Sequence, residues 1–398
     1  MKNLLIILIL CSSCSSPFLK LMHGGKVEQT GFVETIPFDF DKGLPLIQVE
    51  IQGNEYTFLL DTGAPNVISQ ELADEISYEK GVSIDIKDSQ GEKKKQKSVM
   101  IDNIRIGDID FANTGAIIID YGDVFEMKCM GFDGIIGANL MSKLTWEIDY
   151  KNSTVSFSDI KHHFDVPADA EVIPFVPKAI QRTPVIQILV NEAVFDKVTF
   201  DTGANGAINL RKDKADQVVK ELAGFDLHGN LSAGIYGSGA HSVEKYGVVD
   251  SLKIGSLELE AQVVSFESSG SMTLGNKFLK YYRVIIDWNK DEIYLIKEEG
   301  YDKKEYKSFG FFPKKVEDKL MVMGIVNESF AGQQGVELDM QIMEINGVDY
   351  RNVTDSLGCA FITSKPFEEL DEIMVTFLIE EKEVELNLKK ADLIKYKQ

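Results

Sequence analysis

Two aspartates occur in the same four-residue motif, Asp-Thr-Gly-Ala, beginning at Asp61 and at Asp201, 140 residues apart. Each follows an apolar run typical of a strand and precedes a glycine-containing turn. Two carboxyl groups delivered side by side by equivalent turns cannot both ionise cheaply. They would therefore share a proton and could act as an acid–base pair. The alternative is that each aspartate only forms an Asx-type turn.

The sequence around each motif is repeated as well. Four segments of the first half have a counterpart in the second: 34–38 with 171–175, 44–51 with 183–190, 134–140 with 272–278, and 148–150 with 286–288. A lone three-residue motif carries little information, but two copies in matching frames indicate homologous units. The repeat predicts two lobes, residues 31–160 and 161–299, each supplying one aspartate.

Short β-rich runs separated by turn signals predict a mainly β protein. Helices are expected in only two places of these lobes, near residues 69–79 and 210–223. Gly91 and Gly239 lie where a flap hairpin over a cleft could turn, and ordinary hairpin tips are the alternative.

Composition excludes several classes of function. The chain has 398 residues and a net charge of −21, which disfavours nucleic acid and anionic membrane as partners and otherwise serves solubility. Its five histidines include no His-Glu-x-x-His spacing, and no Gly-x-Ser-x-Gly motif occurs. We therefore expect neither a metal nor a cofactor, and no serine nucleophile.

The N-terminus has the pattern of a targeting segment. Lys2 is followed by an apolar run that is too short to span a membrane and then by a Cys-Ser-rich stretch. This resembles a bacterial lipoprotein signal, with residues 1–13 cleaved and Cys14 lipidated. Residues 14–30 would then form a tether at the cell envelope, in the periplasm or at the outer membrane. An ordinary secretory peptide is the alternative.

The C-terminal residues 305–398 form a third unit with a strand, a short helix and a second strand ending in Asn346-Gly347. This pattern resembles a PDZ domain, although Asp339-Met340 replaces the usual Gly-Asp and the loop near 309–312 is atypical. The resemblance implies a small α+β domain with a peptide ligand bound by strand addition. A packing module is the alternative. Cys129 and Cys359 fall in different predicted domains, so we do not expect a disulfide between them.

The paired motifs, each with an apolar-apolar-Gly segment downstream, resemble those of aspartic proteases. The Ala after the Gly is similar to retropepsins, and the fused lobes are similar to pepsin. The whole chain resembles bacterial secreted aspartyl proteases with a C-terminal PDZ domain. The resemblance implies a bilobal acid-protease fold in which Asp61 and Asp201 activate a water molecule.

The same resemblance gives roles to the neighbouring residues. Thr62 and Thr202 would form hydrogen bonds between the lobes, although each could be a plain turn residue. Gly63 and Gly203 would leave room and donate backbone N–H groups, and Ala64 and Ala204 would complete the turns. These roles imply an endopeptidase that acts on proteins or peptides as a monomer. The alternatives are a non-cleaving scaffold that binds peptides, or an autoinhibited enzyme.

Overall fold

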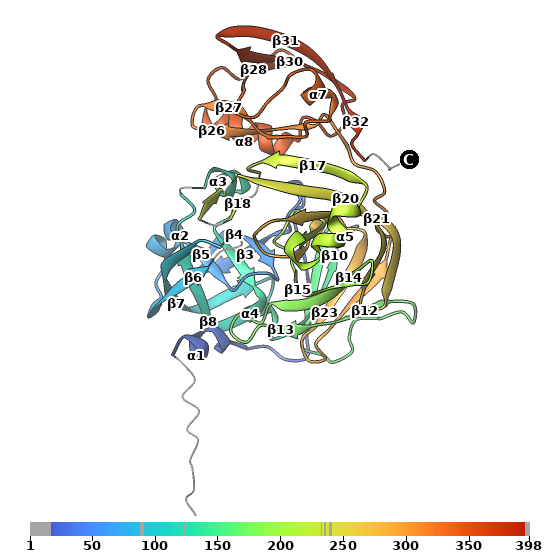
Figure 1. Cartoon of the computed structure of the whole chain (residues 1–398). Helices are drawn as coiled ribbons and strands as arrows, with labels where there is room; N and C mark the ends of the chain where they lie inside the picture. The colour runs from blue at the N-terminus through green and yellow to red at the C-terminus, as the bar shows by residue number, and fades with distance from the viewer. Residues whose placement is uncertain are drawn as a thin grey trace, which may run out of the picture.

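The computed structural model describes residues 17–87, 91–122, 124–231, 233–234, 236–238 and 241–394. The protein is mainly β, as the sequence predicts. In Figure 1 the first half is blue to teal and the second half is green to yellow. The C-terminal unit, orange to red, lies across the top of both.

The first half begins with helix α1 and carries eleven strands and three short helices among the described residues. They are α1 (Pro17–His23), β1 (Lys26–Val27), β2 (Val33–Pro37), β3 (Leu46–Ile51), β4 (Asn54–Asp61), β5 (Val67–Ser69), α2 (Gln70–Glu75), β6 (Glu79–Lys87), β7 (Lys93–Ile106), β8 (Ile109–Ile119), α3 (Phe125–Met130), β9 (Gly134–Gly137), α4 (Ala138–Met141), β10 (Thr145–Asp149) and β11 (Thr154–Ser158).

The second half has a similar series. It comprises β12 (Glu171–Pro174), β13 (Val176–Pro177), β14 (Pro184–Val190), β15 (Ala193–Phe200), β16 (Ile208–Arg211), the 3-10 helix η1 (Lys212–Lys214), α5 (Asp216–Glu221), β17 (Gly224–Gly229), β18 (Ala233–Gly234), β19 (Gly237–Ser238), β20 (Ser242–Ile254), β21 (Leu257–Glu267), β22 (Thr273–Leu274), α6 (Asn276–Leu279), β23 (Tyr282–Asp287) and β24 (Glu292–Lys297).

The two halves repeat one strand order. In the first half the neighbours run β8-β5-β9-β4-β3, and in the second they run β21-β16-β22-β15-β14. In both, the strand that leads to the aspartate pairs in parallel with the strand of the downstream apolar segment, β4 with β9 and β15 with β22. The sequence repeat therefore corresponds to a repeat of topology.

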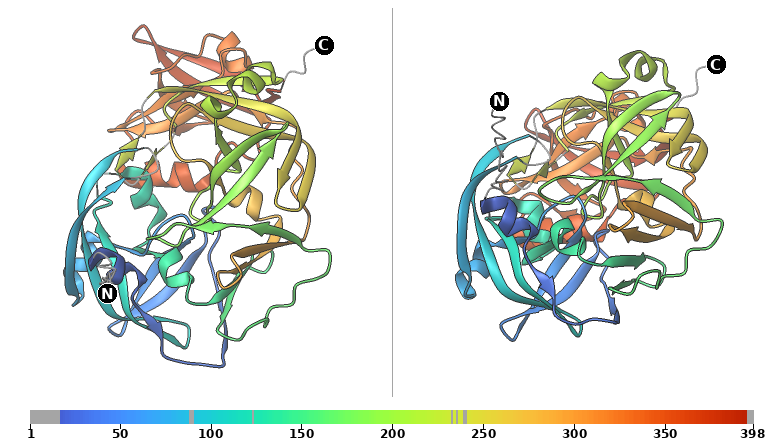
Figure 2. Two further views of the ribbon diagram at one scale, coloured as in Figure 1. Left: turned by 60° about the horizontal axis from the view of Figure 1, so that its bottom comes forward. Right: turned by 90° about the horizontal axis from the view of Figure 1, so that it is seen from below.

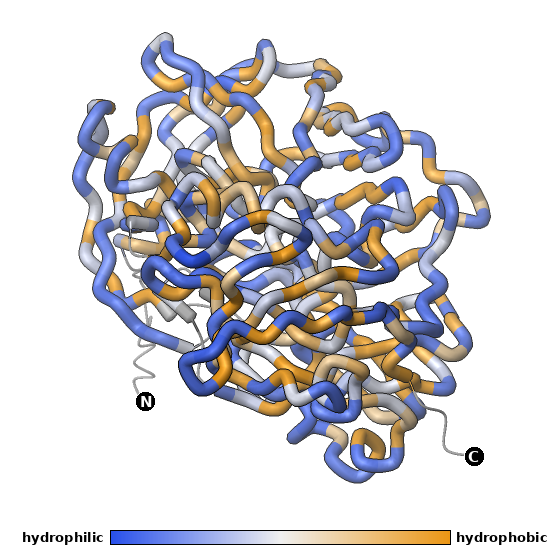
Figure 3. Tube along the Cα trace, turned by 90° about the horizontal axis from the view of Figure 1, so that it is seen from above, coloured by the Kyte–Doolittle hydropathy of each residue, from blue (hydrophilic) through white to orange (hydrophobic). Residues whose placement is uncertain are grey.

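A six-stranded sheet joins the halves, with the order β2-β11-β10-β23-β24-β12. At its centre β10 pairs antiparallel with β23, placing Trp146 opposite Ile286 and Ile148 opposite Val284. All four side chains are fully buried. Because apolar residues alternate along such strands, one face of each enters a core shared by both halves. Figure 3 shows apolar and polar segments following one another along the whole trace.

The helices differ from their predicted extents. Residues 69–79 form only the six-residue helix α2, because the chain from Glu79 onward pairs with β7. In 210–223 only η1 and α5 are helical, because Leu210 is still part of β16 and pairs with Phe266 in β21. In both places strand pairing overrides local helix propensity. No described helix has the length and apolar character needed to cross a bilayer.

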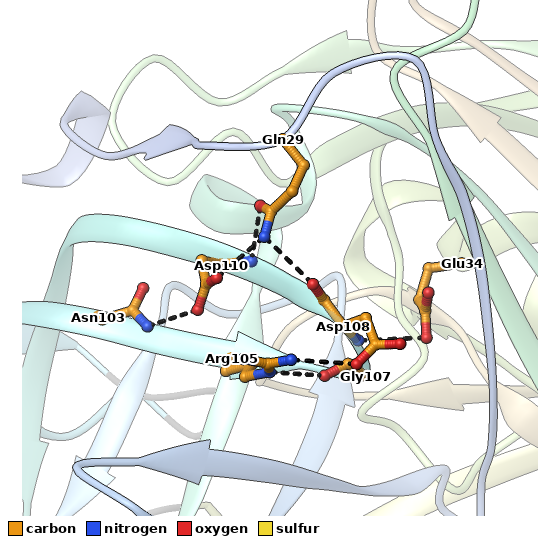
Figure 4. A network of polar contacts seen from close by, with 7 residues as sticks. All are labelled: Gln29, Glu34, Asn103, Arg105, Gly107, Asp108 and Asp110. Atoms are coloured by element: carbon orange, nitrogen blue, oxygen red, sulfur yellow. Dashed lines mark hydrogen bonds and ion pairs between the residues drawn. The ribbon is translucent and has the colours of Figure 1, made fainter.

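Residues 17–30, which we expected to belong to a tether, are packed against the first half. Met22 in α1 is fully buried, and β1 pairs with β8. Gln29 donates to the backbone oxygen of Asp108 and to the carboxylate of Asp110, at 3.1 and 2.9 Å, as Figure 4 shows. Asp108 in turn donates its N–H to Glu34. This part of the predicted tether therefore forms hydrogen bonds with the β7–β8 hairpin.

The C-terminal unit has a core of its own and continues the sheet of the second half. Its elements are β25 (Lys307–Ser308), β26 (Phe311–Val316), β27 (Lys319–Ile325), α7 (Phe330–Gln333), β28 (Gln341–Ile345), β29 (Val348–Asp349), α8 (Asp355–Ser364), β30 (Glu372–Ile379), β31 (Lys382–Lys389) and β32 (Ala391–Asp392). β17 pairs with β27, so one sheet of fourteen strands runs through both parts.

The structure contradicts the expectation that Cys129 and Cys359 remain unpaired. They form a disulfide between α3 of the first half and α8 of the C-terminal unit, with the Cα atoms 5.0 Å apart. Figure 2 shows α8, in orange-red, next to the teal helix α3. Membership in different domains did not prevent pairing, because the C-terminal unit packs directly on the first half.

Candidate active site

Asp61 and Asp201 come from equivalent positions in the two sheets. Asp61 is the last residue of β4, where it pairs with Gly137 of β9. Asp201 follows β15 directly, and its N–H donates to the carbonyl of Leu274 in β22 at 3.0 Å. The two carboxyl groups lie close enough that each shifts the pKa of the other. The structure thus brings together the two aspartates that the sequence repeat singled out.

Thr62 and Thr202 join the two turns through a symmetric set of hydrogen bonds. The Thr62 hydroxyl donates to the carbonyl of Phe200 at 2.6 Å, and the Thr202 hydroxyl donates to the carbonyl of Leu60 at 2.8 Å. Each hydroxyl also accepts the backbone N–H of the other threonine, at 3.0 and 3.1 Å. Both side chains are fully buried. The exchange fixes the position of one aspartate-bearing turn relative to the other.

Gly63 and Gly203 stand where no side chain fits. A Cβ atom at Gly63 would lie 2.5 Å from Cγ of Asp201, and one at Gly203 would collide with the Asp61 carboxyl group. Their N–H groups instead donate to the carboxyl oxygen of the aspartate two residues earlier, at 2.6 Å for Gly63 and 3.0 Å for Gly203. Each glycine therefore both admits the opposite carboxyl group and hydrogen bonds its own.

Ala64 and Ala204 anchor the turns to the segments downstream. The carbonyl of Ala64 accepts the N–H of Ala138 at 2.9 Å, and the carbonyl of Ala204 accepts the N–H of Asn276 at 2.8 Å. The backbone N–H of Ala64 also acts to lower the pKa of the Asp61 carboxyl group. Neither alanine offers a hydroxyl to its neighbouring aspartate.

Burial and mutual proximity favour a protonated pair. Burial raises the pKa of Asp61, and the N–H groups of Gly63 and Ala64 partly oppose that rise. Burial also raises the pKa of Asp201, well above its usual value, and the charge of Asp61 raises it further. Asp201 has a single backbone donor, that of Gly203. Because both pKa values are raised, the pair keeps one shared proton at a pH where an isolated carboxyl group would be ionised.

Two asparagines below the turns escaped the sequence analysis. Asn276 donates to the carbonyl of Thr202 at 2.6 Å and accepts the hydroxyl of Tyr150 at 2.8 Å. Asn139 accepts the N–H of Asn66 at 2.7 Å. Both asparagines lie in the repeated segments 134–140 and 272–278, but the alignment places Asn139 opposite Lys277 and Asn276 opposite Ala138. A residue-by-residue comparison therefore gave no signal.

Lys178 and Thr183 from the β13–β14 hairpin also lie at the site. Thr183 is fully buried and donates its hydroxyl to the carbonyl of Gly63 at 3.3 Å. The positive charge of Lys178 lowers the pKa of both Asp61 and Asp201. In the aligned repeat Thr183 corresponds to Leu44, so the repeat could not identify a polar role at this position.

The β18–β19 segment of the second half contacts the β6–β7 hairpin of the first half. Gly91 follows the tip of the β6–β7 hairpin with a φ of 97°, whereas Gly239 lies outside the described residues. Tyr236, between β18 and β19, accepts a hydrogen bond from Gln96 of β7 at 3.3 Å. The Lys94 ammonium lies 5.2 Å from the centroid of the same ring. A segment of the second half thus reaches a strand of the first.

Within the parts of the chain that the structure describes, no group of three or more His, Cys, Asp or Glu side chains could hold a metal ion. Cys14, the predicted lipidation site, lies outside the described residues.

Comparison with known proteins gives one family match. Residues 47–140 match the model of a family described as Aspartyl protease. The matched stretch contains Asp61 with its motif and the downstream apolar segment at 134–137. It supports a peptide hydrolase, and the family's description suggests the aspartic type. No curated protein matches the chain.

Proposed function

We propose that the protein is an aspartic endopeptidase whose catalytic pair is Asp61 and Asp201. The observation that carries the proposal is the contact between two carboxyl groups from equivalent turns, which are joined by reciprocal threonine hydrogen bonds. The family match covers the turn of Asp61. Because the second half repeats the strand order of the first, we assign the same type of role to Asp201.

The environments of the two aspartates assign their roles. Asp61, whose carboxyl group accepts the N–H of Gly63 and whose pKa the backbone of Ala64 also lowers, is the base that takes a proton from a water molecule as the water oxygen attacks the peptide carbonyl carbon. Asp201, which holds the shared proton, donates it to the carbonyl oxygen. When the tetrahedral intermediate breaks down, the C–N bond cleaves and the leaving nitrogen receives the proton that Asp61 took. The former carbonyl oxygen returns its proton to Asp201 as the C=O bond re-forms, which restores the pair. No covalent intermediate is required.

The proposed enzyme works as a monomer at the bacterial cell envelope, anchored through a lipid on Cys14. One chain already supplies both aspartates and both threonines, so no second copy is needed to complete the pair. Specific activity should therefore stay constant as the protein is diluted. A fall in specific activity that follows dissociation of a dimer would contradict this part of the proposal.

The main test is incubation of the purified protein with a mixed peptide library, with and without pepstatin as a transition-state mimic. We expect internal cleavage of peptides that pepstatin abolishes and that a metal chelator leaves unchanged. A protein that binds library peptides without cleaving any of them would favour the alternative of a peptide-binding scaffold.

A further inference from the structure

The C-terminal unit contacts both halves of the proposed enzyme, by different means. It is joined to the second half by the β17–β27 pairing, in which His228 pairs with Ile325 and Gly229 with Gly324. A shared apolar cluster, with Phe225 and Leu227 on one side and Val326 on the other, reinforces this junction. Its contact with the first half is made by α3, as Figure 1 shows.

An aromatic side chain of α3 fits between two elements of the C-terminal unit. The Lys315 ammonium of β26 lies 4.5 Å from the centroid of the Phe125 ring, and it also forms an ion pair of 2.9 Å with Asp355 of α8. A Cβ atom at Gly358 of α8 would lie 2.7 Å from the Phe125 ring and 2.5 Å from Cδ of Lys315. The surface between β26 and α8 is therefore shaped to the ring, with glycine at the point of closest approach.

Charge and a covalent bond secure the same contact. Glu126 forms an ion pair of 2.7 Å with Lys314 of β26, and the two side chains are only 25% and 12% exposed. One turn further along α3, the buried Cys129 is bonded to Cys359 of α8. A half-buried ion pair is screened less by solvent than a surface pair.

The position of α3 relates this contact to the cleft. Tyr121, between β8 and α3, belongs to the apolar cluster that includes Ala64 of the catalytic turn. The charge of Asp61 contributes to raising the pKa of the Tyr121 hydroxyl, after burial. The sheet that joins the halves, centred on the β10–β23 pair, lies away from the C-terminal unit in Figure 1. The halves are thus tied at one side by this sheet and at another by the C-terminal unit.

We propose that the surface between β26 and α8 is an internal docking site for α3, and that the Cys129–Cys359 bond makes this docking redox-dependent. In the oxidised protein the C-terminal unit acts as a clasp between the two halves and limits access of bulky substrates to the pair of aspartates. Reduction lets α3 leave the surface while the C-terminal unit stays attached to the second half. The effect on substrates rests on the proposed peptidase function, whereas the docking itself does not.

The redox step needs a dithiol reductant of the dithiothreitol or thioredoxin class. A thiolate of the reductant attacks one sulfur of the disulfide, forms a mixed disulfide and releases the other cysteine as a thiolate. The second thiol of the reductant then displaces the first protein cysteine. Two electrons pass to the protein, two protein thiols form after protonation, and the reductant leaves as its own disulfide.

The first test measures docking without any cleavage. Hydrogen exchange of the full chain carrying Cys11→Ser and Cys14→Ser is followed by mass spectrometry, before and after dithiothreitol. We expect faster exchange after reduction in peptides that cover α3, β26 and α8, and unchanged exchange in β10 and β23. Unchanged exchange in α3 would overturn redox control. Faster exchange throughout would show loss of the fold instead of release of a clasp.

Exchanging the charges of Glu126 and Lys314 tests whether the docking surface brings Cys129 and Cys359 together. After removal of the reductant, the rate at which the disulfide re-forms in oxidised glutathione reports how often α3 meets α8. Lys314→Glu should slow this rate about tenfold, the effect of losing roughly 1.4 kcal/mol of docking free energy. Adding Glu126→Lys should restore it, because the pair is re-formed with the charges exchanged. Equal rates in all three proteins would overturn the docking site.

The last test concerns the cleft. Reduction should raise kcat/KM for a long unfolded protein and leave kcat/KM for a short peptide within about twofold, since a short peptide needs less opening of the cleft. Equal changes for both substrates would remove the link between the clasp and access. If no substrate is cleaved in either state, the peptidase proposal fails, while the exchange and re-oxidation results still decide the docking proposal.

Discussion

Thr62 and Thr202 each donate their hydroxyl to the chain of the other half, to Phe200 at 2.6 Å and to Leu60 at 2.8 Å. Because the two threonines directly follow the two aspartates, these bonds set the relative position of the carboxyl groups. The geometry of the proposed active site is therefore a property of both halves together, and it depends on atoms of four buried residues.

Replacing one of these threonines should separate the role of the hydroxyl from that of the side-chain volume. In Thr202→Val the carbonyl of Leu60 and the N–H of Thr62 lose their partners. Each unsatisfied buried group costs about 1–3 kcal/mol, so the free energy of unfolding should fall by roughly 2–6 kcal/mol. Thr202→Ser, which keeps the hydroxyl, is the matched control and should lose far less. Denaturant unfolding measures both.

Removing either catalytic carboxyl group should abolish cleavage and preserve the fold. Asn at position 61 or 201 keeps an oxygen for the N–H of Gly63 or Gly203 but can neither accept nor deliver the shared proton. We expect kcat to fall by at least about 10²–10⁴-fold in each single variant. The double variant should be little worse, because the pair acts as a unit. Near-normal turnover in either single variant would contradict a pair within one chain.

The raised pKa of Asp201 predicts how stability depends on pH. Because the folded protein retains the proton above the usual pKa of 3.8, it binds more protons than the unfolded chain there, and stability decreases as pH rises through this interval. Asp201→Asn removes the group whose deprotonation causes this decrease in stability. Its melting temperature should therefore exceed that of the wild type increasingly from about pH 4 to pH 7.

A surface carboxyl group on the same strand as Asp61 provides the control for that experiment. Glu55 of β4 is exposed, and Glu55→Gln removes one negative charge without touching the pair. Its melting temperature should follow the wild-type curve with a nearly constant offset. If Asp201→Asn gives the same flat offset, the buried pair does not bind its proton as proposed.

The localisation proposal depends on a single side chain. Lipidation of Cys14 should place the protein in the membrane fraction, and Cys14→Ser should move it to the soluble fraction, because acyl chains on that residue provide the attachment. Cys11→Ser is the matched control and should leave the distribution unchanged. Fractionation followed by N-terminal analysis measures the outcome, and a mature chain that still begins at Met1 would reject the signal.

The sequence was most informative where the same residues recur in the same frame. The repeated segments predicted the pairing of Asp61 with Asp201, and they correspond to the repeated strand order of the two sheets. Alternating apolar residues predicted the mainly β composition. The motif and the alternation of apolar residues can both be recognised within a short stretch of sequence. The chain contains each of them twice, once in each half.

Contacts that depend on how separate parts dock were not predictable in this way. The Cys129–Cys359 bond joins residues 230 positions apart, and it forms only because α3 lies against α8. Gln29 belongs to the segment predicted to be a tether, yet its side chain forms a hydrogen bond with Asp110 of β8. Neither the sequence around Cys129 nor that around Gln29 contains a pattern that identifies the surface on which it packs.

The turns also carry a prediction about working pH. Neither Ala64 nor Ala204 can donate a side-chain hydrogen bond to its aspartate, although the backbone N–H of Ala64 already acts to lower the pKa of Asp61. A hydroxyl at these positions would stabilise the charged form and lower the apparent pKa of the pair. The wild type should accordingly keep its shared proton into mildly acidic or near-neutral conditions, where cleavage should peak.

Two substitutions should move the basic limb of the kcat/KM profile in opposite directions. Ala64→Ser combined with Ala204→Ser should shift it to lower pH, because the new hydroxyls favour ionisation of the pair. Lys178→Met should shift it to higher pH, because the positive charge of Lys178 lowers the pKa of both aspartates. The limb reports the pair in the free enzyme, so a short peptide assayed from pH 3 to pH 8 is sufficient. A wild-type maximum in strong acid, or a serine variant whose basic limb stays in place or moves upward, would show that the missing hydroxyls do not set the working range of the pair.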